Sequence, residues 1–210
     1  MAAATDPKHA LTTSGETEPV WIHTEPYSRR PQFPTLNQNL KTEICVVGSG
    51  VAGIQSAYEL VKRGHEVVMV EARDVLSGET GRTSGHLASA LDDSYGSIAK
   101  KHGDKGAQTA ADSHSWAIGR VGEIASELDI DCEYRRLPGY QVSQYDRNKQ
   151  TEKHYDDVKK LKAEVAKAQA LKMSAEYREG YAIKGWDGEP DHRDASVFFN
   201  QGTFHPTKYL

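Results

Sequence analysis

In the first half of the chain, the spacing of hydrophobic residues changes from strand-like to helical and back. This change predicts the structural unit around which the chain is organised. Residues 44–47 form a short apolar run rich in β-branched side chains, as expected for a strand buried on both faces of a parallel sheet. From Val51, apolar residues recur at helical spacing until Arg63 and Gly64, where the pattern ends. A second apolar run covers residues 67–70. The order strand, helix, strand predicts a βαβ unit and hence an α/β fold.

The turn between the first strand and the helix has the sequence GSGVAG, whose glycine spacing is that of a dinucleotide-binding turn. Gly48 lets the chain leave the strand sharply, Gly50 lets backbone N–H groups approach a pyrophosphate, and Gly53 lets the helix pack closely. Glu71 ends the second strand, 18 residues beyond Gly53, where a carboxylate accepts hydrogen bonds from ribose hydroxyls and repels a 2′-phosphate. The candidate cofactor-binding residues of this region are Gly48, Ser49, Gly50, Val51, Ala52, Gly53, Glu71, Ala72 and Arg73.

The loop at 77–86, with the sequence SGETGRTSGH, is a second candidate binding segment. It offers three glycines, four hydroxyl groups and one guanidinium, a set suited to wrapping a pyrophosphate. A flexible surface loop is the alternative interpretation, because glycine and serine clusters are common there. The candidate residues of this loop are Thr80, Gly81, Arg82, Thr83, Ser84, Gly85 and His86.

Helical and strand-like spacing alternate downstream, which predicts an antiparallel α+β region after the βαβ unit. We interpret Pro138 and Gly139 as the turn of a hairpin, and Asp92 and Asp93 as a helix cap. The predicted elements are helices at about 92–101, 104–128 and 158–171, strands at 132–137, 140–145 and 197–199, a loop at 180–194, and a helix starting at 204–206. His114 lies on the apolar stripe of the second of these helices, where a partly buried structural histidine is a simpler interpretation than a catalytic one.

The first 40 residues lack this periodicity. Residues 1–18 are small and polar, which predicts disorder. Residues 19–40 hold four of the eight prolines, a density that excludes a helix or a central strand. The aromatic residues between these prolines leave two alternatives, an extended arm anchored on the surface or a linker. We therefore predict a tail and arm at 1–40, a Rossmann-like nucleotide-binding domain at 41–130 and the start of a substrate domain at 131–210.

Three segments, GSGVAG, VVMVEAR and GETGRTSGHLASALDD, together resemble the amino-terminal part of FAD-dependent oxidoreductases of the D-amino acid oxidase superfamily. The resemblance is greatest to a branch whose members often carry a Rieske iron–sulfur domain at the carboxyl end. It continues in ADSHSWAIGRVGEIASELDIDCEY, RLPGYQ and QGTFHPTKYL, and so covers about residues 20–210. It implies FAD as the cofactor, with the motif glycines at the pyrophosphate, Glu71 at the adenosine ribose and residues 81–86 passing towards the flavin.

The same resemblance implies a reaction, the oxidation of an amine or amino acid by hydride transfer to flavin, with an imine product that hydrolyses. Some relatives attach flavin covalently through a histidine near the position of His86. The most similar branch uses the GRTxxH segment as a non-covalent contact, which is the contact we expect here. Family members continue beyond the FHPxKYL motif, so we expect this chain to be a fragment whose substrate-recognising residues lie mostly beyond Leu210. No catalytic residue is assigned.

Composition excludes several other functions. A net charge of −4 gives no electrostatic case for a nucleic-acid partner. No apolar run approaches the length of a membrane span and no signal-peptide core is present, which favours a cytoplasmic protein acting on a small molecule. The nine histidines and two cysteines show no metal-ligand spacing, including that of a Rieske cluster. Cys45 and Cys132 are expected to be buried free thiols.

Two alternatives to a flavin oxidoreductase stay open. The first is an NAD-linked dehydrogenase, which would retain a nicotinamide instead of a flavin. The second is a catalytically inactive, truncated nucleotide-binding fragment, because a βαβ unit without later strands leaves an open sheet edge and an uncovered apolar face. The hydrophobic fraction of 37% and mean hydropathy of −0.68 are low for a self-sufficient compact domain and agree with this second alternative. The sequence contains no pattern that indicates the electron acceptor.

Overall fold

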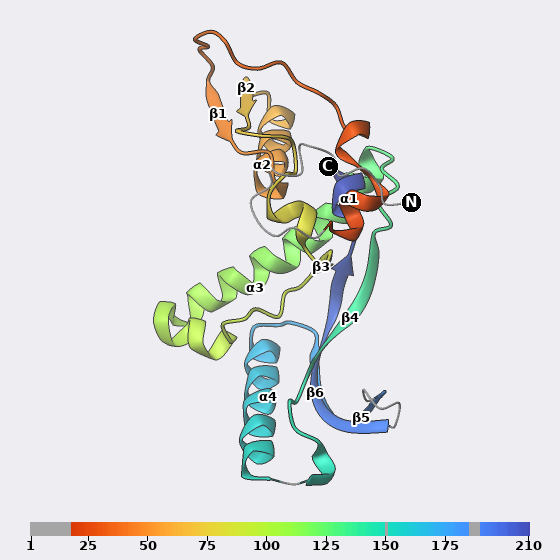
Figure 1. Cartoon of the computed structure of the whole chain (residues 1–210). Coiled ribbons are helices and arrows are strands. Elements are labelled where there is room, and N and C mark those ends of the chain that lie inside the picture. The colour runs from red at the N-terminus through yellow and green to blue at the C-terminus, as the bar shows by residue number, and fades with distance from the viewer. Residues whose placement is uncertain (1–17, 150, 185–189) are drawn as a thin grey trace, which may run out of the picture. The chain divides into compact units, whose positions relative to one another are not determined.

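The chain forms two compact units, shown together in Figure 1. The computed structural model describes residues 18–149, 151–184 and 190–210. The first unit comprises Met1–Gly85, Ile130–Glu133 and Phe204–Leu210, and the second comprises His86–Asp129 and Tyr134–Thr203. Each unit therefore combines segments that are distant in the sequence. The division of the chain at residue 130 into a cofactor domain and a substrate domain stays a prediction. The disorder predicted for residues 1–18 also stays a prediction, since residues 1–17 lie outside the described part.

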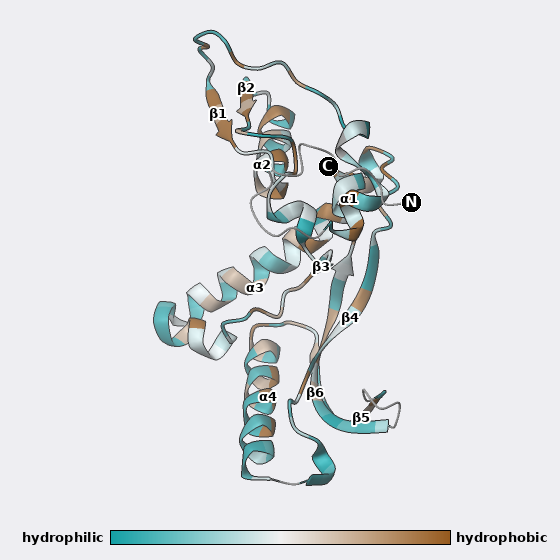
Figure 2. Ribbon diagram, in the orientation of Figure 1, coloured by the Kyte–Doolittle hydropathy of each residue, from teal (hydrophilic) through white to brown (hydrophobic). Residues whose placement is uncertain are grey.

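The first unit contains the predicted βαβ element. Strand β1 (Ile44–Val47), helix α2 (Val51–Lys62) and strand β2 (Val67–Val70) follow one another, and the two strands pair in parallel from Ile44 with Val67 to Val47 with Val70. The expectation that β1 is buried on both faces is wrong, since the side chain of Val47 is 82% exposed. Figure 2 shows the ribbon of β1 in the brown of hydrophobic residues, in agreement with its sequence ICVV.

The proline-rich arm contains a short helix, so the prediction that its prolines exclude helix is wrong. Helix α1 (Val20–Thr24) begins directly after Pro19, and Pro26 follows its end; a 3-10 turn, η2, covers Tyr27–Arg29. Proline is tolerated at these flanking positions because no helical N–H is needed there. The arm is anchored through α1: Ile22 is 2% exposed, whereas the aromatic Phe33 is 70% exposed.

The second unit is built on a four-stranded antiparallel sheet. Its strands are β3 (His86–Leu87), β4 (Arg135–Val142), β5 (Ala175–Lys184) and β6 (Pro190–Thr203). The long strand β6 pairs with all three others, from Thr203 opposite His86 and Arg135 to Pro190 opposite Lys184. The sheet is therefore organised around a strand near the end of the chain.

Two of the predicted elements in this sheet are corrected. Pro138 and Gly139 do not form a hairpin turn: they lie within β4, where the register shifts between Leu137 and Gly139. An edge strand tolerates proline at such an irregularity because that N–H is not needed for pairing. The predicted loop at 180–194 belongs largely to β5 and β6, and the short strand predicted at 197–199 is part of β6.

Helices α3 (Tyr95–Glu127) and α4 (Glu152–Ala170) belong to the same unit, and a 3-10 turn, η4 (Arg147–Lys149), precedes α4. A backbone kink at Gly103 (φ 73°) divides α3, in agreement with the two helices predicted there. The cap is Ser94, whose side chain accepts a hydrogen bond from the Ser97 N–H, and not Asp92 or Asp93. His114 is exposed, so its predicted partial burial is wrong.

The core of the second unit joins both helices to the sheet. Tyr95 and Phe198 are 0% and 1% exposed, and small side chains from α3 and α4 fill the space around them. Close packing of alanines lets the helices approach the sheet tightly. The buried members of this cluster are Tyr95, Ala107, Ala111, Val165, Ala168, Leu171, Ala175 and Phe198.

Candidate functional site

The glycine-rich turn of the first unit has a backbone that only glycine accommodates. Gly48 has φ +101° and donates its N–H to the Val70 carbonyl at 2.8 Å, which ties the turn to the end of β2. A Cβ atom on Gly53 would lie 1.9 Å from the Gly48 carbonyl oxygen. The first turn of α2 therefore packs directly on the backbone of the turn, as predicted from the motif spacing.

Glu71 lies at the end of β2, beside this turn. Its Oε2 accepts hydrogen bonds from the Ser49 N–H and the Ser49 hydroxyl, both at 2.8 Å, and its Oε1 accepts one from the Arg73 N–H at 3.1 Å. Burial raises the pKa of Glu71, but these hydrogen bonds outweigh it and hold the pKa below its usual range. The carboxylate is thus ionised at neutral pH, and its remaining lone pairs can accept further hydrogen bonds.

The loop after β2 meets the start of α2. It includes the 3-10 turn η3 (Glu79–Arg82), whose Thr80 accepts a hydrogen bond from the Val51 N–H at 3.0 Å. A Cβ atom on Gly50 would lie 3.2 Å from the Thr80 hydroxyl oxygen, so the two segments are in close approach. The structure therefore brings together the two candidate segments that the sequence presents separately.

Two further glycines of this loop are closely packed. A Cβ atom on the buried Gly81 would lie 2.8 Å from the Leu76 carbonyl oxygen. Gly85 has φ +72°, and a Cβ atom there would lie 2.6 Å from the carbonyl oxygen of Phe204. Any side chain at this position would therefore clash with that oxygen. At both positions the loop is closely packed within the first unit, and the alternative of a flexible surface loop stays open.

The remaining candidates differ in exposure. Ala52, Ala72, Arg73, Thr83 and Ser84 are exposed, and Ser49 is fully buried. His86 belongs to the second unit, where it begins β3 and pairs with Thr203. The glycine turn, Glu71 and residues 79–85 therefore form one cluster within the first unit, and His86 lies outside that unit.

Sequence reasoning missed a set of contacts that α1 makes with the same loop. Trp21 donates its indole N–H to the Thr83 carbonyl at 2.6 Å, and Thr24 is 2.9 Å from the ring of His205. Helix α5 (Pro206–Tyr209) carries this histidine as its N-cap. The start of α5 at a proline was predicted, but no periodicity in the arm pointed to its contact with α1.

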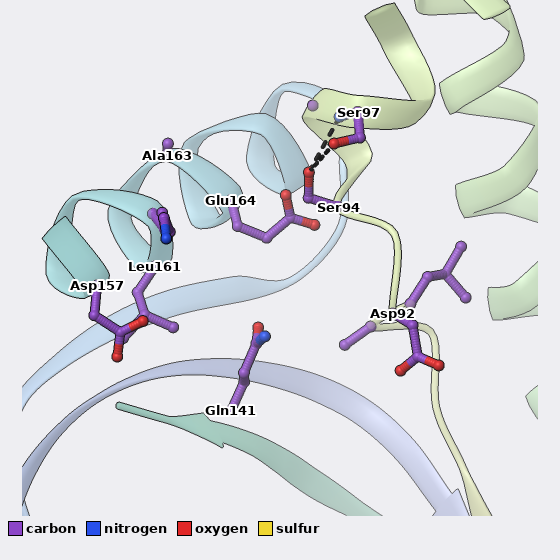
Figure 3. A pocket seen from close by; sticks show the side chains of 12 residues that line it. Asp92, Ser94, Ser97, Gln141, Asp157, Leu161, Ala163 and Glu164 are labelled. Carbon is purple, nitrogen blue, oxygen red and sulfur yellow. Dashed lines mark hydrogen bonds between the residues drawn. The ribbon is translucent and has the colours of Figure 1, made fainter. Parts of the chain in front are cut away.

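The second unit contains a pocket of about 450 Å³, lined by the loop before α3, by α4 and by β4 (Figure 3). Two of its carboxylates serve the fold: Asp157 accepts a hydrogen bond from the Ser143 hydroxyl at 2.6 Å, and Glu164 accepts one from the Tyr95 N–H at 2.9 Å. Because these contacts hold the lining elements together, we assign no ligand to the pocket.

Other site classes receive no support from the described residues. Over the described ranges 18–149, 151–184 and 190–210, no group of three or more His, Cys, Asp or Glu side chains is arranged to hold a metal ion. None of the helices in the part of the chain that the structure describes has the length and apolarity needed to cross a membrane. The expectation of a buried thiol is confirmed for Cys132 and wrong for Cys45, which is exposed.

Comparison with protein families gives one match over most of the chain. The model described as "DAO: FAD dependent oxidoreductase" matches residues 43–210, which include the glycine turn, Glu71 and the loop that follows. FAD is the cofactor of this family. The residues of the cluster fit such a group, because glycines stand where Cβ atoms would fill the turn and Glu71 offers an ionised acceptor beside it.

Curated relatives extend the match. The Bacillus subtilis (strain 168) protein YhfW, named for a Rieske 2Fe-2S iron–sulfur centre, is 30% identical over 180 residues, covering 86% of this chain and 33% of that protein. The gamma-glutamylputrescine oxidoreductase of Escherichia coli (strain K12) is 32% identical over 103 residues, covering 49% of this chain and 24% of the enzyme. The chain thus spans about a third or less of the length of these relatives.

Solved structures share the fold. The L-amino acid deaminase from Proteus vulgaris matches with a TM-score of 0.55 and 21% identity, covering 84% of this chain and 37% of the deaminase. The glycine oxidase from Bacillus cereus matches with a TM-score of 0.53 and 17% identity, covering 80% of this chain and 41% of the oxidase. At these identities the matches establish the fold alone.

Proposed function

This chain belongs to the DAO family of FAD-dependent oxidoreductases, and from that premise we propose that it forms the FAD-binding part of an enzyme. The proposed reaction is the oxidation of a carbon–nitrogen bond of an amine or amino acid. The observation that carries the proposal is the cluster of the glycine turn, ionised Glu71 and Thr80 within one unit. The similarity to gamma-glutamylputrescine oxidoreductase supports an amine substrate.

The glycine turn would hold the pyrophosphate of the cofactor. Gly48 and Gly50 have no side chains, so the main-chain N–H groups of the turn and the positive end of the α2 dipole would be available to bind the phosphates. Gly53 keeps α2 close to β1, which holds that helix end in place. We propose that Ser49, Val51 and Ala52, which stand between these glycines, complete the binding turn.

Glu71 would bind the adenosine ribose. Its carboxylate stays ionised because Ser49 and Arg73 donate hydrogen bonds to it, and an ionised carboxylate accepts hydrogen bonds from two vicinal hydroxyls. Ala72 has a small, exposed side chain, so it leaves space beside the carboxylate. The contact is charge-assisted, which makes it one of the stronger single interactions available to the site.

The loop after β2 would cover the cofactor from the other side. Thr80 fastens it to the first turn of α2, while the buried Gly81 and Gly85 fix its path. We propose that Arg82, Thr83 and Ser84 contribute polar contacts along the cofactor. The non-covalent flavin contact of His86, which belongs to the second unit, is proposed from the family resemblance alone.

Bound flavin supplies the redox chemistry, since it accepts a hydride from a C–H bond adjacent to nitrogen. The residues of this chain bind and orient it; none of them is assigned as a catalytic acid or base. Orientation of two reactants is itself a large contribution to rate, so the contribution proposed for this segment is positioning.

The first experiment is an absorbance spectrum of the purified chain after incubation with FAD and gel filtration. A flavin spectrum at near-equal stoichiometry, bleached by an amine or amino acid under anaerobic conditions, supports both parts of the proposal. A flavin spectrum that no such substrate bleaches supports the cofactor and contradicts the reaction for this segment. Retention of a nicotinamide instead of flavin contradicts the cofactor assignment.

A matched pair of variants locates the site. We expect Glu71→Gln to weaken FAD binding about tenfold, because a charge-assisted hydrogen bond to the ribose is lost. Glu66→Gln, at an exposed position just before β2, is the control and should bind FAD like the unmodified chain. Equal affinities in both variants contradict the role given to Glu71.

A further inference from the structure

Helix α1 contacts the loop at 79–85 from Gly81 to its carboxyl end at Gly85. Ile22 lies beneath the loop, since a Cβ atom on Gly81 would be 3.3 Å from its Cδ1. Trp21 donates its indole N–H to the Thr83 carbonyl at 2.6 Å, and a Cβ atom on Gly85 would lie 2.9 Å from its ring. A five-residue helix at the start of the described chain thus touches the loop at three successive points.

The same helix is held from its other side by the residues around α5. Thr207 donates its hydroxyl to the Trp21 carbonyl at 2.9 Å, and Thr24 lies 2.9 Å from His205 Nε2. The rings of Trp21 and His205 pack edge to face, with centroids 4.7 Å apart. All of these residues belong to the first unit, although 181 positions separate Thr24 from His205 in the sequence.

The hydrogen bonds determine the proton position on His205. Its Nδ1 is 3.3 Å from the Lys208 backbone N–H, which can only donate, so Nδ1 is the acceptor. Nε2 therefore carries the proton and donates it to the Thr24 hydroxyl, which in turn donates to the Val20 carbonyl at 2.9 Å. This chain of donors requires a neutral imidazole, and His205 is 4% exposed.

We propose that α1 is a latch, formed by Trp21, Ile22 and Thr24 on His205 and Thr207, that holds residues 79–85 in the conformation that receives the cofactor. The inference rests on the proposed FAD site. Trp21 is a positioning residue: it touches the loop backbone at Thr83 and Gly85 and acts on the cofactor through that loop. Without the latch, the loop would keep its hydrogen bond at Thr80 and the one from the Phe204 N–H to the Gly85 carbonyl at 3.0 Å, and would lose the contacts of Trp21 at Thr83 and Gly85.

The test compares Trp21→Phe with Trp116→Phe. The first removes the indole N–H and keeps an aromatic ring against the loop, while the second changes a tryptophan on α3 that is 60% exposed. We expect Trp21→Phe to speed amide hydrogen exchange at residues 79–85 without FAD, and to weaken FAD affinity about five- to tenfold, since one hydrogen bond to the loop is lost. Trp116→Phe should change neither.

A second pair guards against misfolding of the tryptophan variant. Valine is close in shape to threonine but has no hydroxyl, so Thr24→Val loses the contact with His205 and should show the same faster exchange at residues 79–85 as Trp21→Phe. Thr24→Ser keeps the hydroxyl and should match the unmodified chain. Unchanged exchange at 79–85 in both Trp21→Phe and Thr24→Val overturns the latch. Faster exchange with unchanged FAD affinity makes α1 a structural contact only and overturns the positioning role.

The exchange measurement needs no cofactor, so it separates this inference from the proposed function. If the unmodified chain retained no FAD, the cofactor assignment would fail while the exchange data still decided whether α1 restrains the loop. If the unmodified chain binds FAD and the variants match it in both measurements, the cofactor assignment stands and the latch fails.

Discussion

The two units hold their polar groups in opposite ways. In the first unit, the candidate site is made by backbone geometry at a few glycines and by Glu71, and the apolar strand β1 beside it leaves Val47 largely exposed. In the second unit, the long strand β6 buries a charge: Asp194 is 0% exposed. A binding site needs accessible groups, whereas a buried carboxylate serves to join elements, so burial distinguishes the two uses of charge.

Within the described residues, the carboxylate of Asp194 is bonded by groups from three elements. Its Oδ1 accepts hydrogen bonds from Arg147 at 2.7 Å and the Gly180 N–H at 2.9 Å, and its Oδ2 is 2.8 Å from His154 Nε2. Burial raises the pKa of Asp194, but these hydrogen bonds outweigh it and keep the pKa below its usual range. The network joins η4, α4 and β5 to β6, which makes it the polar centre of the second unit.

The largest effect is expected from Asp194→Asn. Loss of the charge leaves the Arg147 and His154 side chains facing a neutral amide, and we expect the free energy of unfolding to fall by about 3–5 kcal/mol. Urea denaturation followed by circular dichroism measures it. Asp93→Asn, at a side chain that is 70% exposed, should cost about 0.5 kcal/mol or less. Similar decreases in the free energy of unfolding for both variants would contradict the role of the buried Asp194 carboxylate in joining the elements of the second unit.

Next in size is Gly53→Ala in the first unit. Because the added methyl group meets the Gly48 carbonyl oxygen at 1.9 Å, α2 must shift away from the turn, and we expect FAD affinity to fall about 30- to 100-fold. The control is Gly119→Ala in α3, where a Cβ meets nothing within 4 Å; it should stabilise the chain by about 0.5–1 kcal/mol. Tight FAD binding by Gly53→Ala would exclude the turn as the pyrophosphate site.

Ser94→Ala tests the cap of α3, with an expected loss of about 1 kcal/mol in the free energy of unfolding, because the Ser97 N–H loses its acceptor. Asp92→Ala is the comparison and should have little effect, since Asp92 is exposed and is not the cap. A larger loss for Asp92→Ala than for Ser94→Ala would reinstate the cap predicted from the sequence.

The smallest effect is a pH dependence in the first unit. Burial, and then the charge of Lys208, lower the pKa of His205, while Glu133 and Glu25 oppose them. A folded pKa below that of the unfolded chain, about 6.5, means that the stabilisation is complete above that pH and is lost as the pH falls below it. Protection factors at residues 79–85, which correct amide exchange for its intrinsic pH dependence, should therefore fall below about pH 6.5, and His205→Asn should flatten this dependence. The same pH profile in both proteins would show that another group titrates.

Local patterns were sufficient to predict the βαβ unit and its candidate residues. Strand β1, helix α2 and strand β2 lie where the spacing predicted them, and the structure brings Gly50 and Thr80 into close approach as one cluster. The errors fall where long-range contacts decide. Pro138 reads as a turn from its neighbours alone, yet pairing with β6 carries the chain straight through it.

The sequence by itself determined the glycine turn, because it depends on residues close together in the chain whose spacing is set by one strand, one helix and one turn. The family and its FAD cofactor followed from sequence similarity over residues 43–210. Only the tertiary structure decided that β6 is the centre of the sheet and that α1 lies against His205. Those contacts join segments up to 186 positions apart, and their formation depends on the burial of whole elements, which no local pattern of side chains encodes.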